Sequence, residues 1–461
     1  MRIMLLCLSL AACSFSALAR DQYQVRFDNG LETVVVRACF EGRPPERLYH
    51  NTEAGRFTAW IKAANGNVRI KEGARSLRLG ALAENSCLEW KVNIGQAADL
   101  GDRRLAMRVG RDLLMEADLW FWKGPMERDI EVSVGLPAGV NFSTPWTETG
   151  RSKNTVTFRP GHSPSSWSSH IAIGHFPIIA VAAPGTEIRL AAIGPLDDAQ
   201  REKFSRWIGH TAATVSAVYG RFPQSSPQVL VVPIGPRSEP VPWAHIMRGG
   251  GLAAEFFVDE TRPLADFNAD WTACHELSHM LLPFITHRDR WLSEGLASYY
   301  QNVLRARAGD ISEKQAWQRL FEGFGRGQAG THGGTLAQAT QEGWGATMRV
   351  YWSGAAMMLL ADTRLRALPE SRQSLDSALQ ALQSCCLDNG KTWRAVDLLS
   401  ELDRITGTQI FSSLYREHVH SEEFPDMGAT WQELGIKTRF NRVRMVPDAP
   451  LSAVREAIMK G

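Results

Sequence analysis

The stretch His275-Glu-Leu-Ser-His279, followed by Trp291-Leu-Ser-Glu-Gly-Leu-Ala-Ser-Tyr-Tyr300, carries most of the information in this chain. Histidines at this spacing lie one turn apart on a helix, so His275 and His279 can bind the same metal ion. Glu276 follows His275 and can accept a proton from a water molecule at that metal. Glu294, in a second helical segment, can complete a His2Glu site with an open fourth position. Together these residues predict a zinc hydrolase with one Zn²⁺ per chain.

The second motif matters because the first is short. In a chain with 12 histidines, the first pattern arises by chance roughly once or twice in a hundred such sequences. The alternative to a zinc site is therefore that the His-Glu-x-x-His pattern occurs by chance in a purely structural helix. The helical segment around Glu294 makes that alternative remote.

Residues 1–19 have the features of an export signal. Arg2 precedes the apolar run 3–10, and Ala17-Leu-Ala19 is a small-x-small cleavage pattern. The run is too short to cross a bilayer, and no later run is long enough. We expect a periplasmic or secreted chain without a transmembrane segment. Alternatively, Leu10-Ala-Ala-Cys13 resembles a lipoprotein box and would make an outer-membrane lipoprotein anchored through Cys13.

The overall composition argues against nucleic acid as a partner. Lys and Arg number 51 against 49 Asp and Glu, and no basic stripe is present. Hydrophobic content of 44% and charged content of 22% are ordinary for globular chains. The length suggests two or three domains. The oligomeric state cannot be read from these features.

The cysteines beyond the export signal have different expected roles. Export permits disulfides, and Cys39 with Cys87 is a candidate pair inside a β-rich region. Cys385 and Cys386 either bridge each other or stay free. Cys274 points away from the metal side of its helix, so we expect a small core residue and not a ligand.

Two regions of different pattern follow one another. In residues 20–165, short β-forming runs at 34–38, 88–94 and 130–134 are separated by turn residues, which predicts a β-sandwich domain. Residues 195–461 begin with a helical stretch from Asp197 to about Tyr219, continue with strands at 229–234 and 251–258 and then become mainly helical, which predicts an α+β catalytic domain. The metal helix is expected to begin at Asp266 or Asn268 and to end at Pro283. Further helices are expected at 291–308, 311–325, 348–367, 370–384, 391–406 and 408–419.

Over residues 195–437 the chain resembles the thermolysin-like zinc peptidases whose third ligand is glutamate (gluzincins), most closely the glycyl-aminopeptidase family. The resemblance rests on the two zinc motifs, on Val350-Tyr-Trp-Ser-Gly-Ala355 with the helix that follows, and on Ile405-Thr-Gly-x-x-Ile-Phe with Phe424-Pro425. It implies a thermolysin-like catalytic domain. It also implies that His275, His279 and Glu294 bind zinc and that Glu276 is the general base.

The same resemblance gives roles to two further residues. Tyr351 matches a phenol that hydrogen-bonds the tetrahedral intermediate, where a neutral donor stabilises the transition state. Its alternative is a buried aromatic of an apolar helix. Ser298, one turn after Glu294, is either a hydrogen-bond partner of a metal ligand or a surface serine.

The chain departs from the family pattern near the substrate. The family has Gly-Gly-Leu followed by a glutamate that captures the substrate's amino terminus, and here Ala253 takes that place. Glu255 lies on the same strand face and is expected to replace it, so Glu255, Gly250 and Gly251 are predicted to bind substrate. The connection 280–293 is shorter than usual, and residues 437–461 are too few for the PDZ domain common in the family.

The leading expectation is an exported zinc metallopeptidase acting on a peptide or protein substrate as an aminopeptidase. Zinc would polarise the scissile carbonyl, and Glu276 would pass a proton from water to the leaving amine. Because Ala253 removes the expected amine ligand, an endopeptidase with an open cleft is the first alternative. A catalytically inactive, peptidase-like binding protein is the second.

Overall fold

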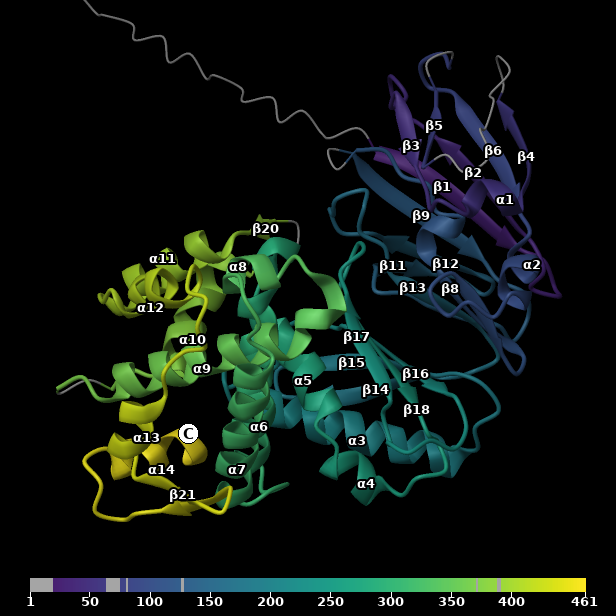
Figure 1. Ribbon diagram of the computed structural model, residues 1–461. Helices are drawn as coiled ribbons and strands as arrows, with labels where there is room; N and C mark the ends of the chain where they lie inside the picture. Colours follow the sequence, from purple (N-terminus) through teal and green to yellow (C-terminus); the bar gives the residue numbers. More distant parts are fainter. Residues whose placement is uncertain (1–19, 64–74, 80–81, 126–127, 370–371, 388–390) are drawn as a thin grey trace, which may run out of the picture.

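The computed structural model shows a mixed α+β fold, as predicted, with β-sheets in the first half and helices dominating the second (Figure 1). The predicted export signal and Cys13 fall on residues outside the described part of the chain. The structure describes residues 20–63, 75–79, 82–125, 128–369, 372–387 and 391–461.

The N-terminal part contains a seven-stranded and a four-stranded sheet, whose inward side chains share one apolar core rich in tryptophan. The runs predicted at 34–38 and 130–134 are confirmed as strands, and the run at 88–94 is a strand as far as Val92. In sheet order, the seven strands are β11 (Thr147–Arg151), β12 (Thr155–Arg159), β9 (Asp129–Gly135), β1 (Arg20–Phe27), β2 (Val34–Cys39), β6 (Cys87–Val92) and β4 (Thr58–Ala63). The four are β10 (Asn141–Ser143), β13 (His170–Gly174), β8 (Asp112–Glu116) and β7 (Ala106–Val109). Smaller elements are β3 (Arg47–Tyr49), β5 (Ser76–Arg78), α1 (Ala54–Phe57), α2 (Ile94–Asp99) and η1 (Ala117–Leu119).

The cysteines behave as the sequence indicates. Cys39 and Cys87 lie opposite each other on β2 and β6 and form a disulfide, which confirms the expected pair. Cys385 and Cys386 bridge each other, the first of the two alternatives. Cys274 is free and buried, as predicted for a core residue.

A five-stranded sheet forms the platform for the second half. Its order is β14 (Ile178–Ala183), β15 (Thr186–Ala192), β16 (Gln228–Pro233), β18 (Ala253–Val258) and β17 (Trp243–Met247). β16 and β18 confirm the two predicted strands and are apolar because they are buried on both faces. β17, which the sequence did not predict, pairs antiparallel with β18 and forms one edge. The helix α3 (Asp198–Ser216) packs against this sheet and starts with a capping box at Asp197 and Gln200 (Figure 1).

The long helices α6 (Arg290–Arg307) and α9 (Thr347–Arg366) cross at very short distance. A side chain at Gly295 would lie 2.4 Å from Cα of Gly354, so both positions require glycine. This crossing brings the face of α6 that carries Glu294 against the face of α9 that carries Tyr351. The C-terminal elements after α5 are α6 (Arg290–Arg307), α7 (Glu313–Ala329), α8 (Leu336–Ala339), η4 (Gly343–Ala346), α9 (Thr347–Arg366), α10 (Leu375–Cys386), β20 (Thr392–Trp393), α11 (Ala395–Thr406), α12 (Ile410–His418), α13 (Gly428–Glu433), β21 (Ile436–Arg439), β22 (Arg442–Met445) and α14 (Ser452–Lys460). The six helices predicted beyond residue 290 are confirmed within a few residues at their ends, except that α10 begins at Leu375 and α11 at Ala395.

The predicted single metal helix is wrong, because the chain breaks at Asp270. That residue is extended, and its carboxylate accepts a hydrogen bond of 2.7 Å from the amide of Thr272. The segment is therefore divided into α4 (Leu264–Ala269), α5 (Thr272–Ser278) and η2 (His279–Leu281). The short connection to α6 contains β19 (Phe284–Ile285) and η3 (His287–Asp289).

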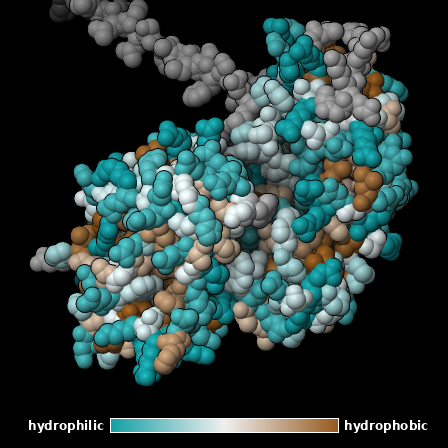
Figure 2. Space-filling view, viewed as in Figure 1, coloured by the Kyte–Doolittle hydropathy of each residue, from teal (hydrophilic) through white to brown (hydrophobic). Residues whose placement is uncertain are grey.

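Figure 2 shows hydrophilic residues over most of the visible face, with hydrophobic residues in small separate groups. Among the described helices, none combines the length and apolar character needed to cross a membrane.

Candidate metal centre

The structure brings His275, His279 and Glu294 together, with both imidazole Nε2 atoms facing one carboxylate oxygen. Oε2 of Glu294 lies 3.3 Å from Nε2 of His275 and 3.5 Å from Nε2 of His279. Ligands of a tetrahedral zinc ion at its usual bond lengths stand roughly 3.3–3.6 Å from one another. Oε2 of Glu294 is also buried without a hydrogen-bond partner among the described residues. An orphaned carboxylate oxygen between two imidazoles fits a metal ion bound to all three.

The far nitrogens of both imidazoles are held by hydrogen bonds. Nδ1 of His275 lies 2.7 Å from Oε1 of Gln301, and Nδ1 of His279 lies 2.8 Å from Oγ of Ser293. Donation from Nδ1 leaves the lone pair of each Nε2 free for the metal. Ser298 is instead buried, and its carbonyl accepts from Asn302, so it is not a surface serine.

Glu276 and Tyr351 line the same cavity as His279 and Glu294. Burial raises the pKa of the Glu276 carboxyl, partly offset by the two histidines. The Tyr351 ring lies 5.8 Å from the ring of His275 at an interplanar angle of 15°. Burial, together with the carboxylates of Glu294 and Glu276, raises the pKa of the Tyr351 phenol, so it stays protonated and can donate. Burial also disfavours the Glu294 carboxylate, but the histidines hold its pKa well below the usual range.

The cavity lies between the metal ligands and the edge strand β17. It is open to solvent and has a volume of about 710 Å³. Trp167, from the loop before β13, contacts Phe284 at a ring distance of 4.3 Å and forms part of one wall. The remaining lining includes Trp243, His245, Met247, Arg248, His287 and Arg290.

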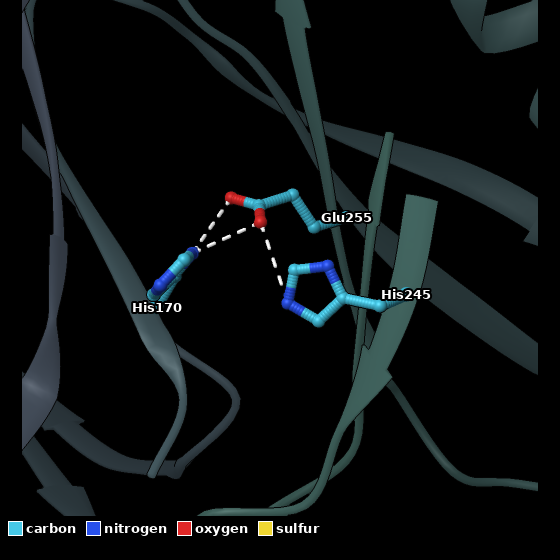
Figure 3. A group of neighbouring side chains, drawn as sticks. All are labelled: His170, His245 and Glu255. Atoms are coloured by element: carbon cyan, nitrogen blue, oxygen red, sulfur yellow. Dashed lines mark hydrogen bonds and ion pairs between the residues drawn. The ribbon is translucent and has the colours of Figure 1, made fainter. Parts of the chain in front are cut away.

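The residues predicted to bind substrate do not line this cavity. Glu255 on β18 is completely buried, and both carboxylate oxygens lie 2.9 Å from Nδ1 of His170 (Figure 3). A Cβ at Gly251 would lie 2.1 Å from the carbonyl oxygen of Pro145, and Gly250 packs against Trp146. The two glycines thus face the N-terminal part of the chain.

His170, His245 and Glu255 form a second group of possible metal ligands, shown in Figure 3. Here the carboxylate is already satisfied by His170, and Nε2 of His245 stands 3.6 Å from Oε2. Burial lowers the pKa of His245 to about 4, so its ring is neutral. Burial also opposes charge on His170, but Glu255 and Glu116 outweigh it and raise the pKa. The group is an ion pair that joins β13 to the sheet of β17 and β18.

Sequence reasoning missed Ser293, Gln301, His245 and Arg248. The partners of the imidazoles follow only from the packing of α5 against α6. His245 lies on β17 and Arg248 directly follows it, so their positions depend on this strand, which the sequence did not predict. The glycine-rich stretch 249–251 between two β-forming runs is a hairpin signal that could have revealed this strand.

Several solved structures have a fold similar to that of this chain. No family model matches the sequence, and no curated protein matches it. Among solved structures, an aminopeptidase N family protein from Idiomarina loihiensis has a TM-score of 0.68 at 14% identity, covering 90% of this chain and 78% of its own. An M1 zinc metallopeptidase from Deinococcus radiodurans has a TM-score of 0.56 at 15% identity, covering 89% and 94%. Yeast LTA4 hydrolase has a TM-score of 0.58 at 13% identity, covering 89% and 68%. The chain therefore has a fold similar to that of M1 zinc metallopeptidases.

Proposed function

We propose that the protein is a zinc-dependent metallopeptidase that hydrolyses peptide bonds. The observation that carries this proposal is the buried, unpartnered Oε2 of Glu294 between two imidazoles whose Nδ1 atoms are already engaged. Glu276 and Tyr351 on the wall of the same cavity supply a base and a donor. The retention of the complete set disfavours an inactive binding protein.

In this proposal His275, His279 and Glu294 hold the zinc, which when bound supplies a Lewis acid for the carbonyl and lowers the pKa of water. Glu276 accepts the proton of the attacking water and delivers it to the leaving amine.

Tyr351, in the same cavity lining, supports the attack of water on the carbonyl. Its protonated phenol donates a hydrogen bond to the oxygen of the tetrahedral intermediate. Because it lies parallel to the His275 ring, its position relative to the ligands is set by packing.

We propose that substrate is not held by a free amino terminus. The only acids in the described lining are Glu276 and Glu294, and both have other roles. Glu255, Gly250 and Gly251 would not contact substrate, because Glu255 is bonded to His170 and the glycines face Pro145 and Trp146. This favours an endopeptidase with an open cleft. The aminopeptidase alternative is supported by the fold, because a structurally similar protein is described as a member of the aminopeptidase N family.

The experiment compares free and N-acetylated peptides of otherwise equal sequence. Equal kcat/KM for the two supports the proposal, with chelator and Glu276→Gln both abolishing cleavage. Refusal of the acetylated peptides would instead restore the aminopeptidase assignment. No cleavage of any peptide by the zinc-loaded protein would remove the peptidase proposal itself.

We further propose export and two structural domains. A disulfide between Cys39 and Cys87 suits an oxidising compartment, in agreement with a signal at residues 1–19 or a lipid anchor at Cys13. An N-terminal β-sandwich (predicted as 20–165) would extend to the end of β13. A thermolysin-like catalytic domain (predicted as 195–461) would include β14 onward, because β13 belongs to the four-stranded sheet and β14 to the five-stranded one.

A further inference from the structure

Arg248 lies directly after β17, on the wall of the metal cavity. Its Nη2 donates to the carbonyl of His279 at 3.0 Å and to the carbonyl of Leu282 at 3.1 Å. These carbonyls belong to the last turn of the segment that carries the metal histidines. The guanidinium is therefore fixed next to the metal centre by two hydrogen bonds that involve one of its nitrogens.

The other terminal nitrogen has no partner. Nη1 of Arg248 is buried without a hydrogen bond, and no acid among the described residues forms an ion pair with this arginine. The guanidinium stays charged at neutral pH, as arginine does in proteins. A buried cation without a counter-ion is costly, and its cost falls when an anion binds.

The charges around Arg248 favour an anionic substrate group. The cavity acids Glu276 and Glu294 are used by the proposed chemistry, whereas Arg290 adds a second cation to the lining. The guanidinium of Arg290 donates to the carbonyls of Thr340 and Gly343. The end of β17 thus carries a positive charge, at Arg248, where an amine-binding site would need a negative charge.

We propose that Arg248 is an anion-binding residue of the cleft that takes a carboxylate of the substrate through its free Nη1. This inference rests on the proposed peptidase function. The carboxylate is either the C-terminal group of a short peptide or an Asp or Glu side chain. Guanidinium and carboxylate form strong charge-assisted hydrogen bonds, so the residue sets substrate preference.

The competing explanation is that Arg248 only caps the end of the metal-binding segment. A cation there stabilises unpaired carbonyls without any ligand. Arg455, in α14, provides a matched control. One of its terminal nitrogens, Nη1, also donates to two carbonyls, those of Leu434 and Val446. Arg455 is not part of the cavity lining.

The test uses N-acetylated peptides in three matched forms: a free C-terminal acid, the corresponding amide, and an amide with Asp replacing Asn. In the wild-type enzyme we expect kcat/KM to favour the acid or the Asp peptide over the neutral amide by about 10- to 100-fold. The favoured form identifies the source of the carboxylate. Arg248→Gln should abolish the preference, Arg248→Lys should keep part of it, and Arg455→Gln should leave it intact. No preference for either carboxylate, or its persistence in Arg248→Gln, would overturn the proposal.

A binding measurement separates failure of this subsite from failure of the peptidase function. The free-acid peptide and its amide are titrated by calorimetry into the Glu276→Gln protein, with zinc and after removal of metal by chelation. Tighter binding of the acid in both states, lost on adding Arg248→Gln, would support the subsite even if no peptide were cleaved. Equal binding of the acid and the amide would overturn it, and a difference seen only with zinc would assign the carboxylate to the metal instead.

Discussion

Replacing Gln301 by leucine should weaken zinc binding strongly, although Gln301 does not touch the metal. Its Oε1 accepts from Nδ1 of His275 at 2.7 Å, and its side chain is only 7% exposed. Leucine has similar size but no acceptor, so the Nδ1 proton would be buried without a partner. Such a loss costs about 1–3 kcal/mol, and partners of this kind change metal affinity by about 10- to 100-fold.

Ser293→Ala is the informative comparison. Ser293 is partly exposed, so water can replace its hydroxyl beside Nδ1 of His279, and we expect a change of about tenfold or less. Ser298→Ala, on the same helix, is the control that should not alter affinity. The assay is competition for zinc with a chromophoric chelator at fixed pH. A larger effect of Ser293→Ala than of Gln301→Leu, or no effect of either, would refute this account of the ligand orientation.

Three further outcomes follow from the structure. Glu276→Gln should keep its zinc by elemental analysis but lose nearly all peptide hydrolysis, because the amide cannot accept the proton; cleavage at the wild-type rate would exclude Glu276 as base. Tyr351→Phe should bind zinc and fold while kcat falls by about 10²–10³, and an unchanged kcat would make the tyrosine a packing residue. The melting temperature should fall as pH rises from about 7 to about 8, because burial raises the pKa of Glu116 to about 8 and Glu255 raises that of His170, so the folded state holds protons that the unfolded state releases. His245, whose pKa is lowered, is largely neutral in both states over this range and does not oppose the trend. A melting temperature that rises over this range by calorimetry would contradict that linkage.

The metal centre could be predicted from sequence because its geometry is local. His275 and His279 are related by one helical turn, and Glu294 sits in a recognisable helix of its own. Tyr351 came from a resemblance and not from spacing, since the crossing of α6 and α9 that places it depends on Gly295 and Gly354.

The substrate side of the cleft could not be predicted in the same way. Alternation along β18 correctly puts Glu255 on the face of Ala253, but it does not say what covers that face. His245 on β17 pairs directly with Glu255, and His170 arrives from β13, far away in the sequence. The burial of Glu255 is thus a product of non-local contacts.

The break before the metal helix shows a different limit. Asp266 and Asn268 are both suitable N-terminal caps, and sequence alone does not rank them. The structure uses neither: Asp270 ends α4, its carboxylate accepts from the amide of Thr272, and α5 begins after Trp271. The ligand spacing survives because both histidines lie after the break.

The central claim is that one zinc ion is held by His275, His279 and Glu294. Crystals of the purified protein measured on both sides of the zinc absorption edge test it directly. The account predicts one anomalous peak per chain, about 2.0–2.2 Å from both Nε2 atoms and from the Glu294 carboxylate. Absence of a peak there in zinc-loaded protein, or a peak only between His170, His245 and Glu255, would contradict it.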